Sequence, residues 1–237
     1  MKQLAFDFGT IAPPTLVAFI PGRNAELLHN VRNLASGHTA ERLIYLWGAP
    51  GSGRSHLLKA AVSAARAAGV EAVYLACEQD TRIPEDLACR GFVALDDVER
   101  LDAVAQVALF NVCNAMREGK HALLVSGNVP PARLPLRQDL LTRLAWGLTY
   151  EVQALSDDEK MQALRQRAVK RGFALGEDVC GYLMTRVPRD LSTLFALLDA
   201  LDRHSMEAKR PVTVALAREL LQSFDVTTSN TESSNER

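Results

Sequence analysis

Short apolar runs recur through the middle of the chain and predict five β-strands. The runs lie at residues 43–46, 72–75, 92–95, 123–125 and 148–152. Runs of this length, bounded by glycine or charge, are typical of strands covered on both faces. Helical patterns lie between most of them, including 55–68, which ends before Gly69, and 103–117, which ends before Gly119. This alternation predicts an α/β fold with a parallel sheet and helices on both of its faces.

From about residue 156 the apolar positions have helical spacing only. Ser156 and Glu159 have the spacing of a capping box, which predicts a helix beginning there. The last dozen residues are almost entirely polar and are predicted to be disordered. We therefore divide the chain into a tail at 1–16, an α/β subdomain at 17–155, a small helical subdomain at 156–225 and a disordered tail at 226–237.

Composition narrows the classes of function. A net charge of −1 over 237 residues argues against strong sequence-independent binding to DNA, because such binding requires surplus lysine and arginine. The four cysteines form no CxxC pair, as expected of free thiols in a reducing cytosol. The chain contains no run of about 18 apolar residues, so no membrane-spanning helix is predicted. We expect a cytoplasmic protein that meets no membrane and meets DNA only indirectly.

The strongest chemical signal is the segment Gly-Ala-Pro-Gly-Ser-Gly-Arg-Ser at 48–55, which follows one predicted strand and opens a helix. Its glycines let backbone amides turn inward to form an anion nest, and the helix N-terminus adds its positive dipole end. The hydroxyl of Ser55 is placed to reach Mg²⁺. The residues expected to hold the nucleotide here are Gly48, Pro50, Gly51, Ser52, Gly53, Arg54, Ser55 and His56.

One position departs from the phosphate-loop pattern GxxxxGK[ST], because Arg54 stands where lysine is usual. Arginine keeps the positive charge, but its planar fork cannot act as a compact ammonium between the β- and γ-phosphates. We therefore expect a bound nucleotide and slow intrinsic hydrolysis. The alternative is a glycine-rich turn without a ligand.

An acidic motif follows the glycine-rich segment about 40 residues later. The apolar run 92–95 ends in Asp96 and Asp97. A buried strand would deliver Asp96 beside the phosphate loop, where it would hold Mg²⁺ through water or through Ser55. Asp97 falls where ATPases place the residue that polarises the attacking water, but its side chain is one methylene shorter than glutamate. The motif therefore also predicts slow ATP hydrolysis by this chain.

Several stretches together resemble a known family. They lie at 45–48, 51–58, 141–147, 155–157, 171–173 and 193–195. Through them the chain, over about residues 3–224, resembles the DnaA-related AAA+ family and, within it, the Hda regulators. Arginine at position 54 is itself a feature shared with Hda proteins. The resemblance implies an AAA+ P-loop core with a helical lid.

The resemblance also implies roles for individual residues. Asn128 corresponds to the sensor on the γ-phosphate side, Arg143 to the arginine finger that enters a neighbour's nucleotide site, and Arg189 to the lid sensor. Residues 19–22 and Asn24 lie where the family forms part of its adenine pocket. The alternatives are a turn residue for Asn128, a surface cation near a helix end for Arg143 and a helix-terminus residue for Arg189.

The first residues of the chain resemble a clamp-binding peptide. Gln3 could bond at a pocket rim, while Leu4 with Phe6 or Phe8 could enter an apolar groove. A peptide this short binds weakly, but two copies on two subunits of a clamp would gain avidity. The alternative is an edge strand, in which the same apolar residues face the core.

These implications combine into one expected function, with two rivals. The chain would bind ADP or ATP with Mg²⁺, engage the sliding clamp of DNA polymerase III and stimulate ATP hydrolysis by DnaA, as a negative regulator of replication initiation. It would have weak or no ATPase activity of its own, and both a monomer and a homodimer remain open. The rivals are a DNA-acting AAA+ ATPase, such as a helicase loader or a shortened initiator-like factor, and a small-molecule P-loop kinase.

Overall fold

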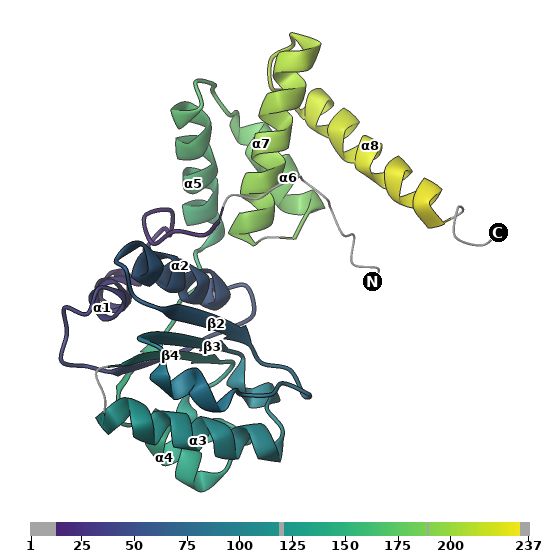
Figure 1. The fold of residues 1–237 in the computed structure, drawn as a ribbon. Helices are drawn as coiled ribbons and strands as arrows, with labels where there is room; N and C mark the ends of the chain where they lie inside the picture. Colours follow the sequence, from purple (N-terminus) through teal and green to yellow (C-terminus); the bar gives the residue numbers. More distant parts are fainter. Residues whose placement is uncertain (1–12, 119–120, 189, 233–237) are drawn as a thin grey trace. The chain divides into compact units, whose positions relative to one another are not determined.

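The computed structural model describes residues 13–118, 121–188 and 190–232 and divides into two units (Figure 1). One unit comprises residues 13–155 and contains a β-sheet, and the other begins at Ser156 and is helical. The two units meet in the sequence directly before the helix whose start the capping box predicts.

The first unit is built on a five-stranded sheet with the order β2-β3-β4-β1-β5, in which every strand pair is parallel. The predicted α/β class and the five strands are therefore confirmed. The order brings the carboxyl ends of β1, β3 and β4 side by side at one edge, where parallel α/β sheets bind ligands. The strands are β1 (Leu43–Trp47), β2 (Ala72–Ala76), β3 (Phe92–Asp96), β4 (Ala122–Gly127) and β5 (Leu148–Glu151).

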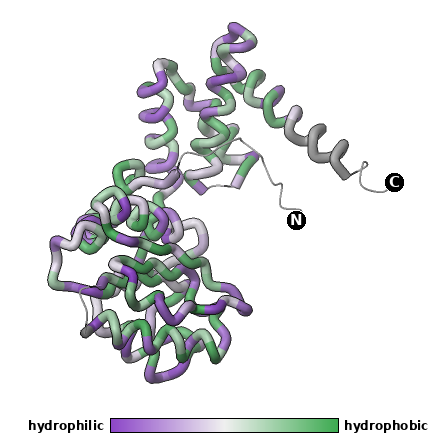
Figure 2. Tube along the Cα trace, in the orientation of Figure 1, coloured by the Kyte–Doolittle hydropathy of each residue, from purple (hydrophilic) through white to green (hydrophobic). Residues whose placement is uncertain are grey.

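Helices cover both faces of this sheet. On one face α1 (Ala25–Ala35) and α2 (Arg54–Ala67) pack on strand residues such as Ile44 and Leu124. On the other face α3 (Ala103–Glu118) and α4 (Gln138–Leu144) contribute to a second core, which includes the next residue along β1, Tyr45. Successive strand residues point to opposite faces, so a strand covered on both sides has no polar face. The strands accordingly appear largely hydrophobic in Figure 2.

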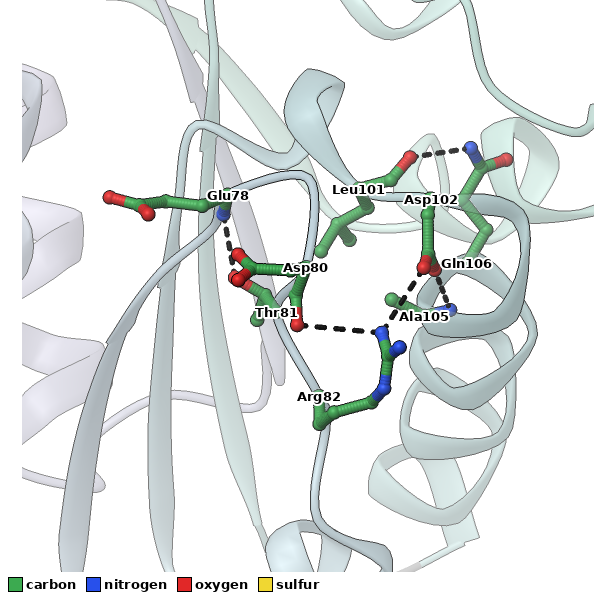
Figure 3. Close-up of polar contacts among 8 residues, drawn as sticks. All are labelled: Glu78, Asp80, Thr81, Arg82, Leu101, Asp102, Ala105 and Gln106. Atoms are coloured by element: carbon green, nitrogen blue, oxygen red, sulfur yellow. Dashed lines mark hydrogen bonds and ion pairs between the residues drawn. The ribbon is translucent and has the colours of Figure 1, made fainter.

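The start of α3 is fixed by a group of polar contacts (Figure 3). The Oδ1 of Asp102 accepts a hydrogen bond from the Ala105 amide at 2.8 Å, and its Oδ2 accepts from Arg82 at 3.1 Å. Gln106 donates to the carbonyl of Leu101 at 2.9 Å. Its Oε1 accepts from the amide of Arg137, the residue before α4, at 3.0 Å. These contacts fix the first turn of α3, and the last of them joins it to the start of α4.

The second unit is a helical domain with its own apolar core. The predicted capping box is confirmed, because the Ser156 hydroxyl accepts from the Glu159 amide while the Glu159 carboxylate accepts from the Ser156 amide. Two ion pairs join the first and third helices of this unit. Arg167 of the first helix pairs with Asp199 at 2.6 Å, and Arg171, which caps its C-terminus, pairs with Asp202 at 2.9 Å. The helices are α5 (Asp157–Lys170), α6 (Glu177–Arg186), α7 (Leu191–Ala208) and α8 (Val214–Glu232).

The end of α8 differs from the expectation. The polar composition predicts disorder from residue 226, whereas the helix continues to Glu232. A helix satisfies its backbone groups by local hydrogen bonds and needs no apolar core to continue for a further turn or two. None of the helices in the described part of the chain combines the length and apolar character required to span a membrane.

Candidate functional site

Residues 48–55 form a closed turn between β1 and α2. The backbone φ angles of Gly51 and Gly53 are 78° and 102°, in the left-handed region that glycine adopts without strain. The amide of Ser52 donates to the carbonyl of Ala49 at 3.1 Å, so the loop folds back on itself. The glycine pattern that predicts a phosphate loop therefore corresponds to a local conformation that other residues adopt poorly.

Two of the glycines also lie in close packing contact with neighbouring segments. A Cβ atom added to Gly48 would lie 2.6 Å from the carbonyl oxygen of Val152 and 3.0 Å from the Ser52 hydroxyl. A Cβ atom added to Gly53 would lie 3.1 Å from the ring of Phe19. The loop is thus seated against the segment after β5 on one side and against residue 19 on the other.

The loop leads directly into the N-terminus of α2. The amide of Leu57 makes the first i→i−4 bond, to the carbonyl of Gly53, so the amides of residues 54–56 precede the helical ladder. Such amides carry partial positive charge, and Ser55 beside them is exposed. Amides that precede the hydrogen-bond ladder of a 14-residue helix provide a site suited to an anion such as a phosphate.

Arg54 points to the acidic end of β3. Its guanidinium nitrogen Nη2 lies 3.2 Å from Oδ1 of Asp97, and its side chain is only 10% exposed, against 33% for that of Asp97. The other terminal nitrogen, Nη1, is buried without a hydrogen-bond partner among the described residues. Asp97 has a φ of 57°, which is uncommon for a residue other than glycine. The two predicted site residues are therefore paired with each other.

Asp96 is buried and has two hydrogen-bond donors. Tyr74 on β2 donates its hydroxyl to Oδ2 at 2.7 Å, and Ser126 on β4 donates to Oδ1. The Ser126 hydroxyl also accepts from the Asp97 amide at 3.1 Å. Asp96 thus connects the two strands beside its own, and these hydrogen bonds fix its carboxylate at the carboxyl edge of the sheet.

Glu99 is a third carboxylate at this edge and was not anticipated from the sequence. It lies in a short 3₁₀ turn, η2 (Val98–Arg100), which follows Asp97, and its Oε2 is buried with no hydrogen-bond partner in the described part of the chain. Burial raises the pKa of Glu99, and the charge of Asp97 raises it further, while Arg54 opposes the shift. Its position three residues after Asp96 is the signal that could have indicated it.

The metal expectation can be tested against these oxygens. The described residues contain no cluster of three or more His, Cys, Asp or Glu side chains suited to a metal ion. Mg²⁺ is commonly held by one or two carboxylates together with the phosphates of a bound nucleotide. Asp96 and the exposed Ser55 fit that manner of binding, in which the nucleotide brings most of the ligands.

Asn128 follows β4 at the same edge and is exposed. The neighbouring carbonyl of Val129 accepts from the Tyr45 hydroxyl at 2.8 Å, so the chain is anchored directly after Asn128. Burial raises the pKa of Tyr45, and Glu99 raises it further, so the phenol remains protonated and donates. The sensor role of Asn128 stays a prediction.

The proposed adenine segment meets the phosphate loop through aromatic contacts. The rings of Phe19 and His56 lie 5.9 Å apart, and Nε2 of His56 is 3.3 Å from the carbonyl oxygen of Thr15. Burial lowers the pKa of His56, which favours the neutral ring. Asn24 is committed elsewhere, because its amide group exchanges two hydrogen bonds of 2.8 Å with the backbone of Gln153. The adenine role of residues 19–22 and Asn24 stays a prediction.

Arg143 lies on α4, on the face of the sheet opposite to α2. Its Nε donates to the side-chain oxygen of Asn114 at 2.8 Å. Its guanidinium carbon lies 3.8 Å from the ring centroid of Trp146 and 5.0 Å from that of Phe110. No carboxylate of the described residues pairs with it. The arginine is therefore held by neutral groups and keeps its charge uncompensated.

Five predicted site residues lie outside the described residues. They are Gln3, Leu4, Phe6 and Phe8 of the proposed clamp-binding peptide and Arg189 of the proposed lid sensor. The residue after the last of these, Asp190, accepts from the Thr193 amide at 2.9 Å and caps α7.

Comparison with known proteins identifies the lid and the fold. Residues 157–221 match the family described as "Hda, lid domain". Domain III of the Thermotoga maritima replication initiation protein DnaA is similar in structure, with a TM-score of 0.70 and 17% identity over 94% of this chain and 99% of that one. This likeness shows a shared AAA+ fold.

Two further structures support the same fold. A replication initiator DnaA bound to AMPPCP and single-stranded DNA gives a TM-score of 0.66 with 18% identity over 82% of this chain, which spans 66% of that one. The Thermotoga maritima RuvB Holliday junction branch migration motor gives a TM-score of 0.61 with 15% identity over 90% of this chain and 72% of that one. The predicted architecture, an AAA+ sheet followed by a helical lid, is confirmed.

Proposed function

Because this chain joins an AAA+ fold of the DnaA type to a lid of the Hda family, we propose that it is a regulator of DnaA. In this proposal it stimulates hydrolysis of the ATP bound to DnaA, using Arg143 as an arginine finger, and so converts the initiator to its ADP form. The reaction takes place in the partner's site. This chain supplies a positive charge where negative charge develops on the transferred phosphoryl group.

The observation that carries the proposal is the environment of Arg143. A half-buried arginine usually pairs with a carboxylate, because an uncompensated charge is costly to remove from water. Arg143 is instead held by the amide of Asn114 and the ring of Trp146. Its charge remains available to an anion supplied from outside the chain, such as the triphosphate of a bound ATP.

The protein's own nucleotide would have a structural role. The amides of residues 48–55 would hold the phosphates of ADP or ATP, with Mg²⁺ between them, Ser55 and Asp96. Asp97 is paired with Arg54 at 3.2 Å, so its carboxylate is not free to polarise water. A weak or absent intrinsic ATPase is the expected consequence. Asn128 and Arg189 keep their proposed roles as sensors.

The first residues would connect the protein to the replication machinery. Gln3, Leu4, Phe6 and Phe8 are proposed to bind the sliding clamp of DNA polymerase III, so that DNA is met only through the clamp. A clamp with several identical pockets would raise the affinity of a dimer by avidity. Replacing both Gln3 and Leu4 by Ala should then abolish capture of the protein by immobilised clamp.

The direct test is a reconstituted hydrolysis assay with DnaA, clamp-loaded DNA and this protein. Removal of an arginine finger lowers phosphoryl-transfer rates by about 10³–10⁵-fold in related switches, so Arg143→Ala should remove nearly all stimulation. Arg218→Ala is the matched control, since Arg218 is an exposed arginine of the lid helix α8. Equal stimulation by both variants would contradict the proposal.

A further inference from the structure

Trp146 carries two guanidinium groups on its ring. The central carbon of Arg143 lies 3.8 Å from the ring centroid, and that of Arg117, on α3, lies 4.3 Å from it. Both distances are well inside the limit of about 6 Å for a cation–π contact, and tryptophan is the strongest acceptor. The indole is 40% exposed, a large fraction for a tryptophan in a folded domain.

The contacts of Arg143 involve only part of its guanidinium. Its central carbon lies over the indole ring, and Nε donates to Asn114 at 2.8 Å. In the part of the chain that the structure describes, no acceptor binds the two terminal nitrogens. Those nitrogens are the ones that arginine presents to phosphate as a planar fork. The ring and the amide therefore orient the group without occupying the end that binds an anion.

The local charge favours an anionic ligand. Arg117 and Arg143 share one ring, and neither forms an ion pair with a described carboxylate. Two like charges held this close repel each other, and the ring faces offset that repulsion only in part. A polyanion that approaches the terminal nitrogens would relieve it, so the surface is complementary to a triphosphate presented by another protein.

We propose that Trp146 is the positioning residue for Arg143. The indole fixes the plane of the guanidinium before the partner arrives, so the finger loses little rotational freedom when it meets the phosphates. This inference rests on the proposed function, since it explains how the finger is aimed. It assigns Trp146 no contact with the partner's nucleotide and predicts an effect on the rate at saturation rather than on docking.

The test compares two replacements of the ring in the reconstituted assay. Trp146→Phe keeps an aromatic face, whereas Trp146→Leu keeps apolar bulk without one. A cation–π contact contributes about 0.5–2 kcal/mol, and each 1.4 kcal/mol is tenfold in rate, so Trp146→Leu should lower the maximal stimulated rate by about 2- to 30-fold. Trp146→Phe should recover most of it. The concentration for half-maximal stimulation should change less than the rate in both variants.

The results for the two residues distinguish the positioning role of Trp146 from the finger role of Arg143. If Trp146→Leu stimulates as well as the unaltered protein while Arg143→Ala does not, the positioning role is wrong and the finger stands. If Arg143→Ala also stimulates normally, the proposed function itself fails.

A spectroscopic measurement does not depend on activity or on the stability of a variant. In the unaltered full chain, side-chain NMR signals of Arg143 should be displaced by the ring current of Trp146, and its Nε–H should exchange slowly because Asn114 accepts from it. Unperturbed signals and rapid exchange would overturn the inference.

Discussion

The pairing of Arg54 with Asp97 predicts that one substitution lowers the stability of the protein and raises its affinity for nucleotide. In the protein without nucleotide, Asp97 neutralises a guanidinium that is almost fully buried, so Asp97→Asn should destabilise the fold. In the proposed nucleotide site, the phosphates would use the same guanidinium. The substitution should therefore also strengthen nucleotide binding, because a competing carboxylate and a negative charge near the phosphates are removed together.

The magnitude follows from the burial of the two partners. Fully exposed ion pairs contribute about 0–1 kcal/mol, and breaking a fully buried one costs about 3–5 kcal/mol. With exposed fractions of 10% and 33%, and with Glu99 near enough to take over part of the pairing, about 1–2 kcal/mol is expected. The gain in ADP affinity should be about 3- to 10-fold, since tenfold corresponds to about 1.4 kcal/mol.

Replacing Asp97 by asparagine removes its negative charge with little other change. It has the shape of aspartate, and it tolerates the left-handed conformation that φ of 57° requires at this position. Alanine would remove the charge and add backbone strain at the same time. Urea unfolding gives the stability of the ligand-free variant, and titration calorimetry with ADP gives the affinity.

The two measurements together test whether Asp97 competes with the nucleotide for Arg54. A variant that is less stable without nucleotide and binds ADP more tightly supports competition for Arg54. If Asp97→Asn binds ADP more weakly than the unaltered protein, Asp97 contributes to the bound state and the interpretation of the ion pair is wrong.

Two further predictions concern the same edge of the sheet. Gly48→Ala should lower the ADP affinity measured by calorimetry at least tenfold. The added methyl would lie 2.6 Å from the Val152 carbonyl oxygen, so the loop must move. An unchanged affinity would exclude the loop as the binding site. The raised pKa of Glu99 means that the folded state holds this proton more tightly than the unfolded chain, so its contribution to stability is lost as the pH rises through the folded pKa. Glu99→Gln should therefore gain stability relative to the unaltered protein as the pH rises above the ordinary pKa of glutamate, about 4.3. A difference between the two free energies of unfolding that stays constant with pH would contradict this.

Much of the fold could be predicted because its signals are local. Each strand is an apolar run that needs only its own residues to be recognised, and the capping box at Ser156 involves residues three positions apart. The phosphate loop is likewise contiguous, and Gly51 and Gly53 mark the left-handed conformations of its turn. Such features depend on backbone geometry over a few residues, which the sequence determines directly.

The contacts that define the chemistry are not local, and only the tertiary structure decided them. Arg54 meets Asp97 because β1 and β3 end at the same edge of a parallel sheet, although their order in the sheet places β4 between them. Glu99 reaches that edge through a turn after a left-handed residue, which no periodicity announces. The guanidinium of Arg143 is oriented by an indole three residues later and by Asn114 on another helix. The sequence determined which groups the chain carries, and the packing of the two helical layers on the sheet determined which of them meet.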